Sequence, residues 1–109
     1  MIKQETIIAL ATPNGLGAIS VIRISGSNAI SITEKVFKPK GNKKLSNQKS
    51  HTVHLGHLIK NEHELDEVLI TLFKGPNSYT GEDTIEISCH GSTFCLLYTS
   101  DAADDVRGV

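Results

Sequence analysis

The chain has 109 residues, a length that fits one small domain. Its 11 basic and 12 acidic side chains give a net charge of −1, whereas proteins that bind nucleic acid through phosphate contacts are usually basic. Its 39% of hydrophobic residues excludes disorder throughout, and its two cysteines exclude a disulfide framework. No apolar run approaches the roughly 20 residues of a membrane span and no signal-peptide pattern opens the chain, so we expect a soluble cytoplasmic protein with no membrane contact.

The first third of the chain predicts a hairpin followed by a helix. Residues 6–11 are a short apolar run that closes at Pro13-Asn14-Gly15, and residues 18–25 are rich in β-branched side chains. We therefore expect two strands joined by a glycine-containing turn. Apolar residues at helical spacing predict a helix over residues 28–37, which Pro39 ends.

The middle of the chain predicts a basic loop and a second hairpin. Residues 38–50 are polar, and six lysines lie between positions 35 and 49. We expect a solvated surface loop here, and a contact with RNA phosphates is the alternative. Residues 52–59 and 68–73 are typical of strands, and Asn61-Glu62-His63-Glu64 suits the turn between them.

The last patterned segment predicts a fifth strand and fixes the fold class. Residues 74–83 are rich in turn formers, and residues 84–89 alternate as a strand does. Five strands and one helix predict an α+β domain with a small mixed β-sheet.

The character of the sequence changes after residue 94. Residues 96–105 continue no pattern and resemble the translation of a transposase adapter used in sequencing libraries. We therefore expect one domain over residues 1–94 and a non-native tail over residues 95–109, with a genuine short tail as the alternative.

Two glycine and cysteine motifs are weak candidates for chemistry. Gly15-Leu16-Gly17 has the glycines of a phosphate-binding loop, but a strand follows it where a helix is needed, and no glycine of the chain precedes a lysine. Cys89 and His90 resemble a nucleophile and its base, but neighbouring strand residues point to opposite faces. We expect a tight turn at the first motif and no catalytic residue at the second.

Three histidines at a spacing of three are a candidate metal site. In a strand, His51 and His57 share one face and His54 points to the other, which separates the three possible ligands. We expect half-buried strand histidines and no metal.

Arg23 and Glu86 are a more useful pair. Arg23 shares a strand face with Ile19 and Val21, and Glu86 lies between Ile85 and Ile87 in a short strand. A charge drawn into a sheet needs a partner or a ligand. The residues alone favour a structural salt bridge, with a ligand site as the alternative.

Several motifs together indicate one family. Residues 76–83, with Thr84-Ile85-Glu86 and Cys89-His90-Gly91, closely resemble a signature of the tRNA uridine-modification GTPases called MnmE or TrmE, in their N-terminal domain. Further similar segments occur in the family's order: Ala11 to Gly17, Val21 to Gly26, Phe37-Lys38-Pro39, His54-Leu55-Gly56-His57 and Asp66-Glu67-Val68. The resemblance covers residues 6–94, and several motifs in order are specific where one would be weak.

The resemblance implies a folate-binding, dimerising domain similar to the folate-binding part of aminomethyltransferases. The family's ligand would be a one-carbon derivative such as 5-formyl- or 5,10-methylene-tetrahydrofolate, held near the dimer interface. Its folate-contacting arginine and glutamate match Arg23 and Glu86. The resemblance therefore changes the expected salt bridge at these residues into a cofactor-binding site.

The chain also departs from the family pattern. Leu16 stands where many members have a basic residue, and Ala18, Ser20 and Ser92 replace glycines. A further folate-contacting lysine has no counterpart. The family's G domain, which binds GTP with Mg and K, and its C-terminal cysteine have no match, so we expect no catalysis by this chain alone.

The resemblance implies a role for the full-length protein. It would act with the FAD-dependent partner MnmG, also called GidA, to install an aminomethyl-type group at C5 of the wobble uridine of tRNA. Two alternatives are a stand-alone one-carbon-folate enzyme of the aminomethyltransferase type and a structural dimerisation module that binds no folate.

Overall fold

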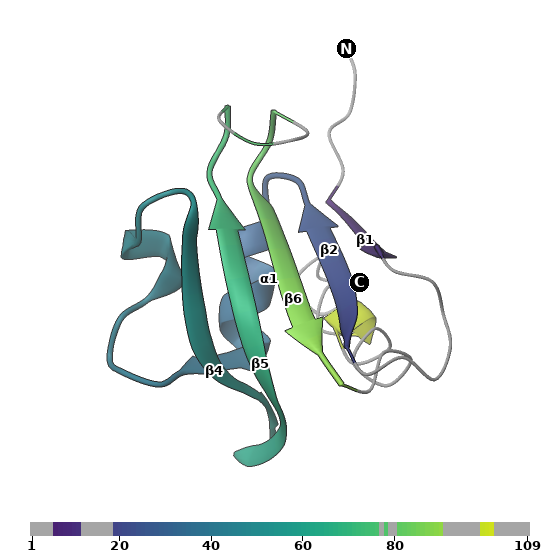
Figure 1. Cartoon of the computed structure of the whole chain (residues 1–109), viewed down its shortest axis with the longest axis vertical. Coiled ribbons are helices and arrows are strands. Elements are labelled where there is room, and N and C mark those ends of the chain that lie inside the picture. Colours follow the sequence, from purple (N-terminus) through teal and green to yellow (C-terminus); the bar gives the residue numbers. More distant parts are fainter. Residues whose placement is uncertain (1–5, 12–18, 77, 79–80, 91–98, 102–109) are drawn as a thin grey trace.

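The computed structural model describes residues 6–11, 19–76, 78, 81–90 and 99–101. Within them the chain forms a six-stranded sheet in the order β1-β2-β6-β5-β4-β3, with the helix α1 packed against it, and residues 99–101 are also helical (Figure 1). The elements are β1 (Ile7–Leu10), β2 (Ser20–Ser25), α1 (Ala29–Val36), β3 (Phe37–Pro39), the 3₁₀ helix η1 (Leu45–Asn47), β4 (Thr52–Lys60), β5 (His63–Phe73) and β6 (Thr84–Cys89).

The predicted α+β class is confirmed. Both predicted hairpins occur as the antiparallel pairs β1–β2 and β4–β5, and α1 lies where a helix was expected. All five pairings that the structure describes are antiparallel, rather than mixed as expected. The predicted turn at Pro13-Asn14-Gly15, the Gly15-Leu16-Gly17 motif and most of the predicted tail lie outside the described residues.

The connections after the helix differ from the prediction in two details. The helix ends before Pro39, because Phe37 is already extended and begins β3, which pairs with β4. The expected surface loop after it is largely exposed, as predicted, but it also contains η1, whose Leu45 is buried in the core. An apolar side chain beneath a polar segment thus fixes the lysine-rich region to the domain.

The second hairpin turn is tighter than the sequence suggested. It consists of Asn61 and Glu62, with φ angles of 50° and 68°, and His63 already belongs to β5. Two consecutive positive φ angles are the mark of a two-residue turn that matches the twist of its strands.

One face of the sheet forms the core. Helix α1 lies behind the sheet in Figure 1 and covers this closed face. It contributes Ala29, Ile32 and Val36. The strands contribute the fully buried aliphatic side chains Ile22, Ile24, Leu58, Ile70, Leu72, Ile85 and Ile87. Each such side chain stabilises the fold by about 1.5–3 kcal/mol relative to an exposed one.

The opposite, open face of the sheet is not covered by a helix in the described part of the chain. The register places Arg23, Glu86, Thr71 and Val53 side by side across β2, β6, β5 and β4 on this face. Large apolar side chains on the same face are 38–64% exposed: Ile7, Ile19, Val53, Leu55 and Leu69. The open face therefore combines a polar pair with accessible apolar surface.

No helix within the described ranges has the length and apolar character needed to cross a membrane.

Candidate functional site

The open face carries a hollow of about 730 Å³ above β2 and β6. The hollow is bounded by the sheet, the start of β4 and the loop after β5, and its lining residues are Arg23, His51, Phe73, Pro76, Ser78, Thr84 and Glu86. Its volume lies within the range of about 300–1,000 Å³ that is usual for small-molecule sites.

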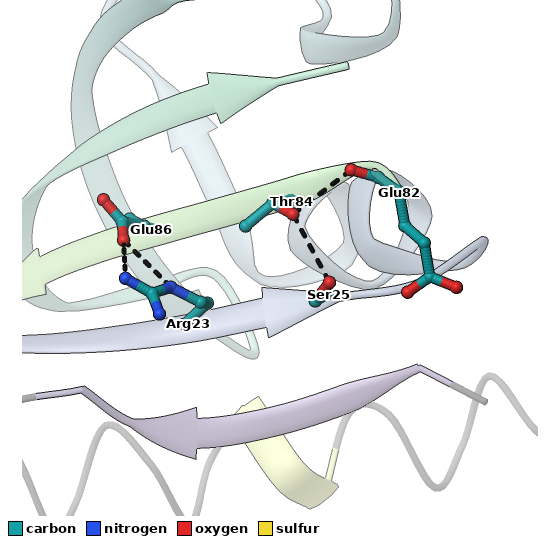
Figure 2. A network of polar contacts seen from close by, with 5 residues as sticks. All are labelled: Arg23, Ser25, Glu82, Thr84 and Glu86. Atoms are coloured by element: carbon teal, nitrogen blue, oxygen red, sulfur yellow. Dashed lines mark hydrogen bonds and ion pairs between the residues drawn. The ribbon is translucent and has the colours of Figure 1, made fainter. Parts of the chain in front are cut away.

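Arg23 and Glu86 form an ion pair in this hollow. They are direct partners in the β2–β6 register, and the Arg23 Nε and Nη2 atoms donate to Glu86 Oε2 at 3.0 and 2.5 Å (Figure 2). The side chains are 37% and 26% exposed, so solvent reaches both. This ion pair is the structural salt bridge that the residues alone favoured, whereas their role in cofactor binding stays a prediction.

The geometry of the pair leaves one acceptor available. Both arginine donors reach the same carboxylate oxygen, and Glu86 Oε1 has no hydrogen-bond partner within the described part of the chain. An ionised carboxylate accepts through both oxygens. Glu86 therefore presents an oriented acceptor to whatever enters the hollow.

The loop between β5 and β6 forms one wall of the hollow and is tied to β2. Gly26 N–H donates to the Asp83 carbonyl at 2.9 Å, and Gly75 N–H donates to Asp83 Oδ1 at 2.9 Å. The Ser78 hydroxyl donates to the Glu82 carbonyl. Gly26, which follows β2, is thus in contact with Asp83, which precedes β6. This contact positions the wall of the hollow beside Arg23.

Gly26 has a conformational reason to be glycine. Its φ is 140°, and a Cβ at this position would overlap Thr6. Any larger residue would displace the start of β1 from the end of β2.

A polar network joins β2 and β6 at the end of the hollow that this loop borders. Thr84 is buried, and its hydroxyl donates to the Glu82 carbonyl at 3.2 Å and lies 3.3 Å from Ser25 Oγ (Figure 2). Ser25 and Thr84 are direct partners across β2 and β6, one pair along from Arg23 and Glu86 on the same face. The network therefore lies directly beside the ion pair.

Two aromatic rings of the site were not predicted from the sequence. His51 and Phe73 pack edge to face with ring centroids 5.3 Å apart, and both line the hollow. His51 precedes β4 and has a φ of 64°, a left-handed conformation that is uncommon for residues other than glycine. Its Nδ1 lies 2.9 Å from Ser50 Oγ, which accepts the Lys74 N–H at 2.8 Å. Nothing in the sequence predicts the positive φ angle of His51.

The other histidines are placed as predicted. His54 points to the helix side of the sheet, whereas His57 lies on the open face with its Nε2 3.7 Å from Glu64 and Glu67 carboxylate oxygens. Among the described residues no group of three potential ligands could hold a metal ion. The three histidines therefore do not converge.

Cys89 and His90 also separate as predicted. Cys89 is buried, and His90 is bound instead to Asp66 through its backbone N–H at 2.8 Å and its Nδ1 at 3.1 Å. The structure therefore shows no nucleophile and base in contact at this position.

Known proteins match the part of the chain that contains this site. Residues 6–105 match the family profile described as "GTP-binding protein TrmE N-terminus". The chain is 67% identical over 94 residues to a tRNA modification GTPase MnmE of Flavobacterium johnsoniae, covering 86% of this chain and 20% of that protein. A protein of the same name from Flavobacterium psychrophilum is 62% identical, with the same coverage, and one from Bacteroides thetaiotaomicron is 53% identical over 94 residues, 85% of this chain and 20% of that protein.

The chain thus spans about a fifth of the length of the curated relatives that it matches. The profile match extends past residue 94, and the non-native origin of residues 95–109 stays a prediction. Since the profile covers nearly all of the sequence, the chain belongs to the family of the TrmE N-terminus.

Proposed function

We propose that the chain is the N-terminal part of a tRNA modification GTPase and that its open-face hollow binds a one-carbon tetrahydrofolate, such as the 5-formyl or 5,10-methylene derivative. The observation that carries this proposal is the carboxylate of Glu86, which is held through one oxygen by Arg23 and offers the other to the hollow. The relatives' name, tRNA modification GTPase, supports the cellular context.

The chemistry of a pterin suits this arrangement. Its amino group and the adjacent ring N–H form a donor edge that can reach a carboxylate, and hydrogen bonds to an ionised acceptor are stronger than neutral ones. Arg23 fixes the orientation of the acceptor. Phe73, His51 and Pro76 provide a largely apolar wall for the ring system. The bound folate would supply the one-carbon unit, and the chain's residues would bind and orient it.

The remaining roles concern the full-length protein. GTP, Mg and K would bind in a separate G domain, and modification of C5 of the wobble uridine of tRNA would require the FAD-dependent partner MnmG in the cytoplasm. The open face favours a homodimer through this domain, because five large apolar side chains are exposed on it. This chain would contribute binding and dimerisation rather than catalysis.

Isothermal titration calorimetry with 5-formyltetrahydrofolate tests the site. We expect Glu86→Ala to weaken binding by about 1–3 kcal/mol, because the ligand's polar edge loses its partner. Glu64→Ala is the matched control, since it removes a carboxylate at the far hairpin, where Glu64 lies near His57. We expect it to bind like the wild type.

Other outcomes favour the two alternatives. Equal affinity of Glu86→Ala and the wild type would remove Glu86 from the site. A folded wild-type chain that binds no folate would favour a structural dimerisation module, and turnover of a folate substrate by the chain alone would favour an aminomethyltransferase-like enzyme.

A further inference from the structure

Charge is strongly segregated along this nearly neutral chain. Positions 35–61 contain seven lysines and no acidic residue, whereas positions 62–86 contain seven acidic residues and a single lysine. The lysine-rich segment runs from the end of α1 through β3 and η1 into β4, at one edge of the sheet (Figure 1). We call residues 35–49 the basic lobe. The net charge of −1 therefore hides a strongly positive region.

The basic lobe is not neutralised by its own neighbours. All six of its lysines are exposed: Lys35, Lys38, Lys40, Lys43, Lys44 and Lys49. None of them has an ion pair with a described residue. The nearest carboxylate in sequence, Glu34, accepts hydrogen bonds from the Ser46 backbone N–H and hydroxyl, both at 3.1 Å. These ammonium groups are therefore available to a polyanion.

The lobe is shaped as well as charged. Two hollows of about 470 Å³ lie on either side of residues 39–43. Lys38, Lys43 and Lys44 line the first together with Glu34, and Lys40, Lys43 and His54 line the second. The segment is fixed in place, because Leu45 is buried in the core and Lys74 Nζ donates to the Ser46 carbonyl at 2.9 Å. A flexible charged tail would have no such shape.

The positive charge of the basic lobe affects the pKa of His54. Partial burial and the nearby Lys43 ammonium both lower the pKa of His54. The same positive field that disfavours an imidazolium favours a phosphate at this place. The field and the two hollows coincide at Lys43.

We propose that the basic lobe binds the phosphate backbone of RNA, with Lys43 at the centre of the contact. Its affinity for phosphates follows from charge and shape alone, and the choice of tRNA as the bound RNA rests on the proposed function. A regularly charged backbone suits several lysines around shallow hollows better than an isolated acidic side chain does. The folate hollow and the basic lobe would place the one-carbon donor and the tRNA on one domain.

Fluorescence anisotropy with labelled, unmodified tRNA tests this proposal with the full chain. We expect Lys43→Glu to weaken binding about tenfold at low salt, and to reduce by about one the slope of log affinity against log salt between about 50 and 200 mM. Lys60→Glu is the matched control, because it changes the net charge equally at the far hairpin among acidic residues. We expect its affinity to lie within about twofold of the wild type. Lys43→Gln should show about half the effect on a logarithmic scale.

Three results would overturn the inference: no tRNA binding by the folded wild type, equal weakening by Lys43→Glu and Lys60→Glu, or displacement of tRNA by an equally charged polyglutamate, which would indicate an acidic protein partner. Calorimetry with 5-formyltetrahydrofolate separates this failure from that of the folate site, since Lys43→Glu should bind folate normally. A chain that binds tRNA but no folate would contradict only the proposed folate function.

Discussion

The two faces of the sheet differ in what their side chains do, although the same strands supply both. On β2 and β6, Ile22 and Ile87 point into the closed face, while Arg23 and Glu86, one residue away in each strand, meet in the hollow. The closed face excludes water and provides the stability of the domain. The open face carries a partly exposed ion pair, and such pairs generally contribute little to stability. The residues that we propose for ligand binding and those that stabilise the fold are thereby one position apart along each strand.

The largest expected effect tests this separation on two neighbouring residues. Ile87→Ala should lower the free energy of unfolding by about 2–5 kcal/mol, because it leaves a cavity in the closed face. Glu86→Gln should change it by less than about 1 kcal/mol, because the Arg23–Glu86 pair is partly exposed. Urea denaturation measures both. A similar loss of stability in the two variants would contradict the division of roles between the faces.

A smaller effect sharpens the description of the open face. His51→Ala should weaken 5-formyltetrahydrofolate binding by about 0.5–1.5 kcal/mol, because the edge-to-face ring beside Phe73 is lost from the wall of the hollow. His57→Ala removes a histidine from the same face outside the hollow and should bind like the wild type. Calorimetry that finds the two variants alike would remove His51 from the site.

The closed face could be predicted from the sequence because its signal is local. Alternating β-branched residues identified β2 and β6, and helical spacing identified α1. The short β3 was missed because its three residues include a proline and are paired by β4, far along the chain. The pairing of β3 with β4 requires a glycine at position 56, since a Cβ there would lie 2.5 Å from atoms of the Phe37 ring.

The open face was less predictable, because its site depends on pairing between distant strands. Arg23 and Glu86 are 63 residues apart, and only the β2–β6 register brings them together. Each looked unusual in its own strand, which suggested a partnership, and the family resemblance supplied the ligand. His51 gave no such signal, because its place in the hollow follows from a backbone angle and from the Ser50 contact.

The smallest expected effect concerns His54, which links the closed side of β4 to the basic lobe. Because burial and Lys43 lower its pKa, the folded state favours neutral imidazole, and the associated stability is complete above the ordinary value of 6.5 and decreases as pH falls through the folded pKa. The Thr52 hydroxyl donates to the Lys49 carbonyl at 2.6 Å, so His54 Nε2, 2.8 Å away, is the donor to Thr52 Oγ1. The neutral ring already makes this hydrogen bond, so protonation gains nothing there.

His54→Gln should therefore lose less stability than the wild type when the pH falls from about 7.5 to 5.5. Urea denaturation at the two pH values checks this difference, in which the contributions of the other histidines largely cancel. Lys43→Glu should raise the pKa of His54, as measured by NMR titration, because an attractive charge replaces a repulsive one while burial persists. An unchanged pKa in that variant would show that burial alone acts on His54.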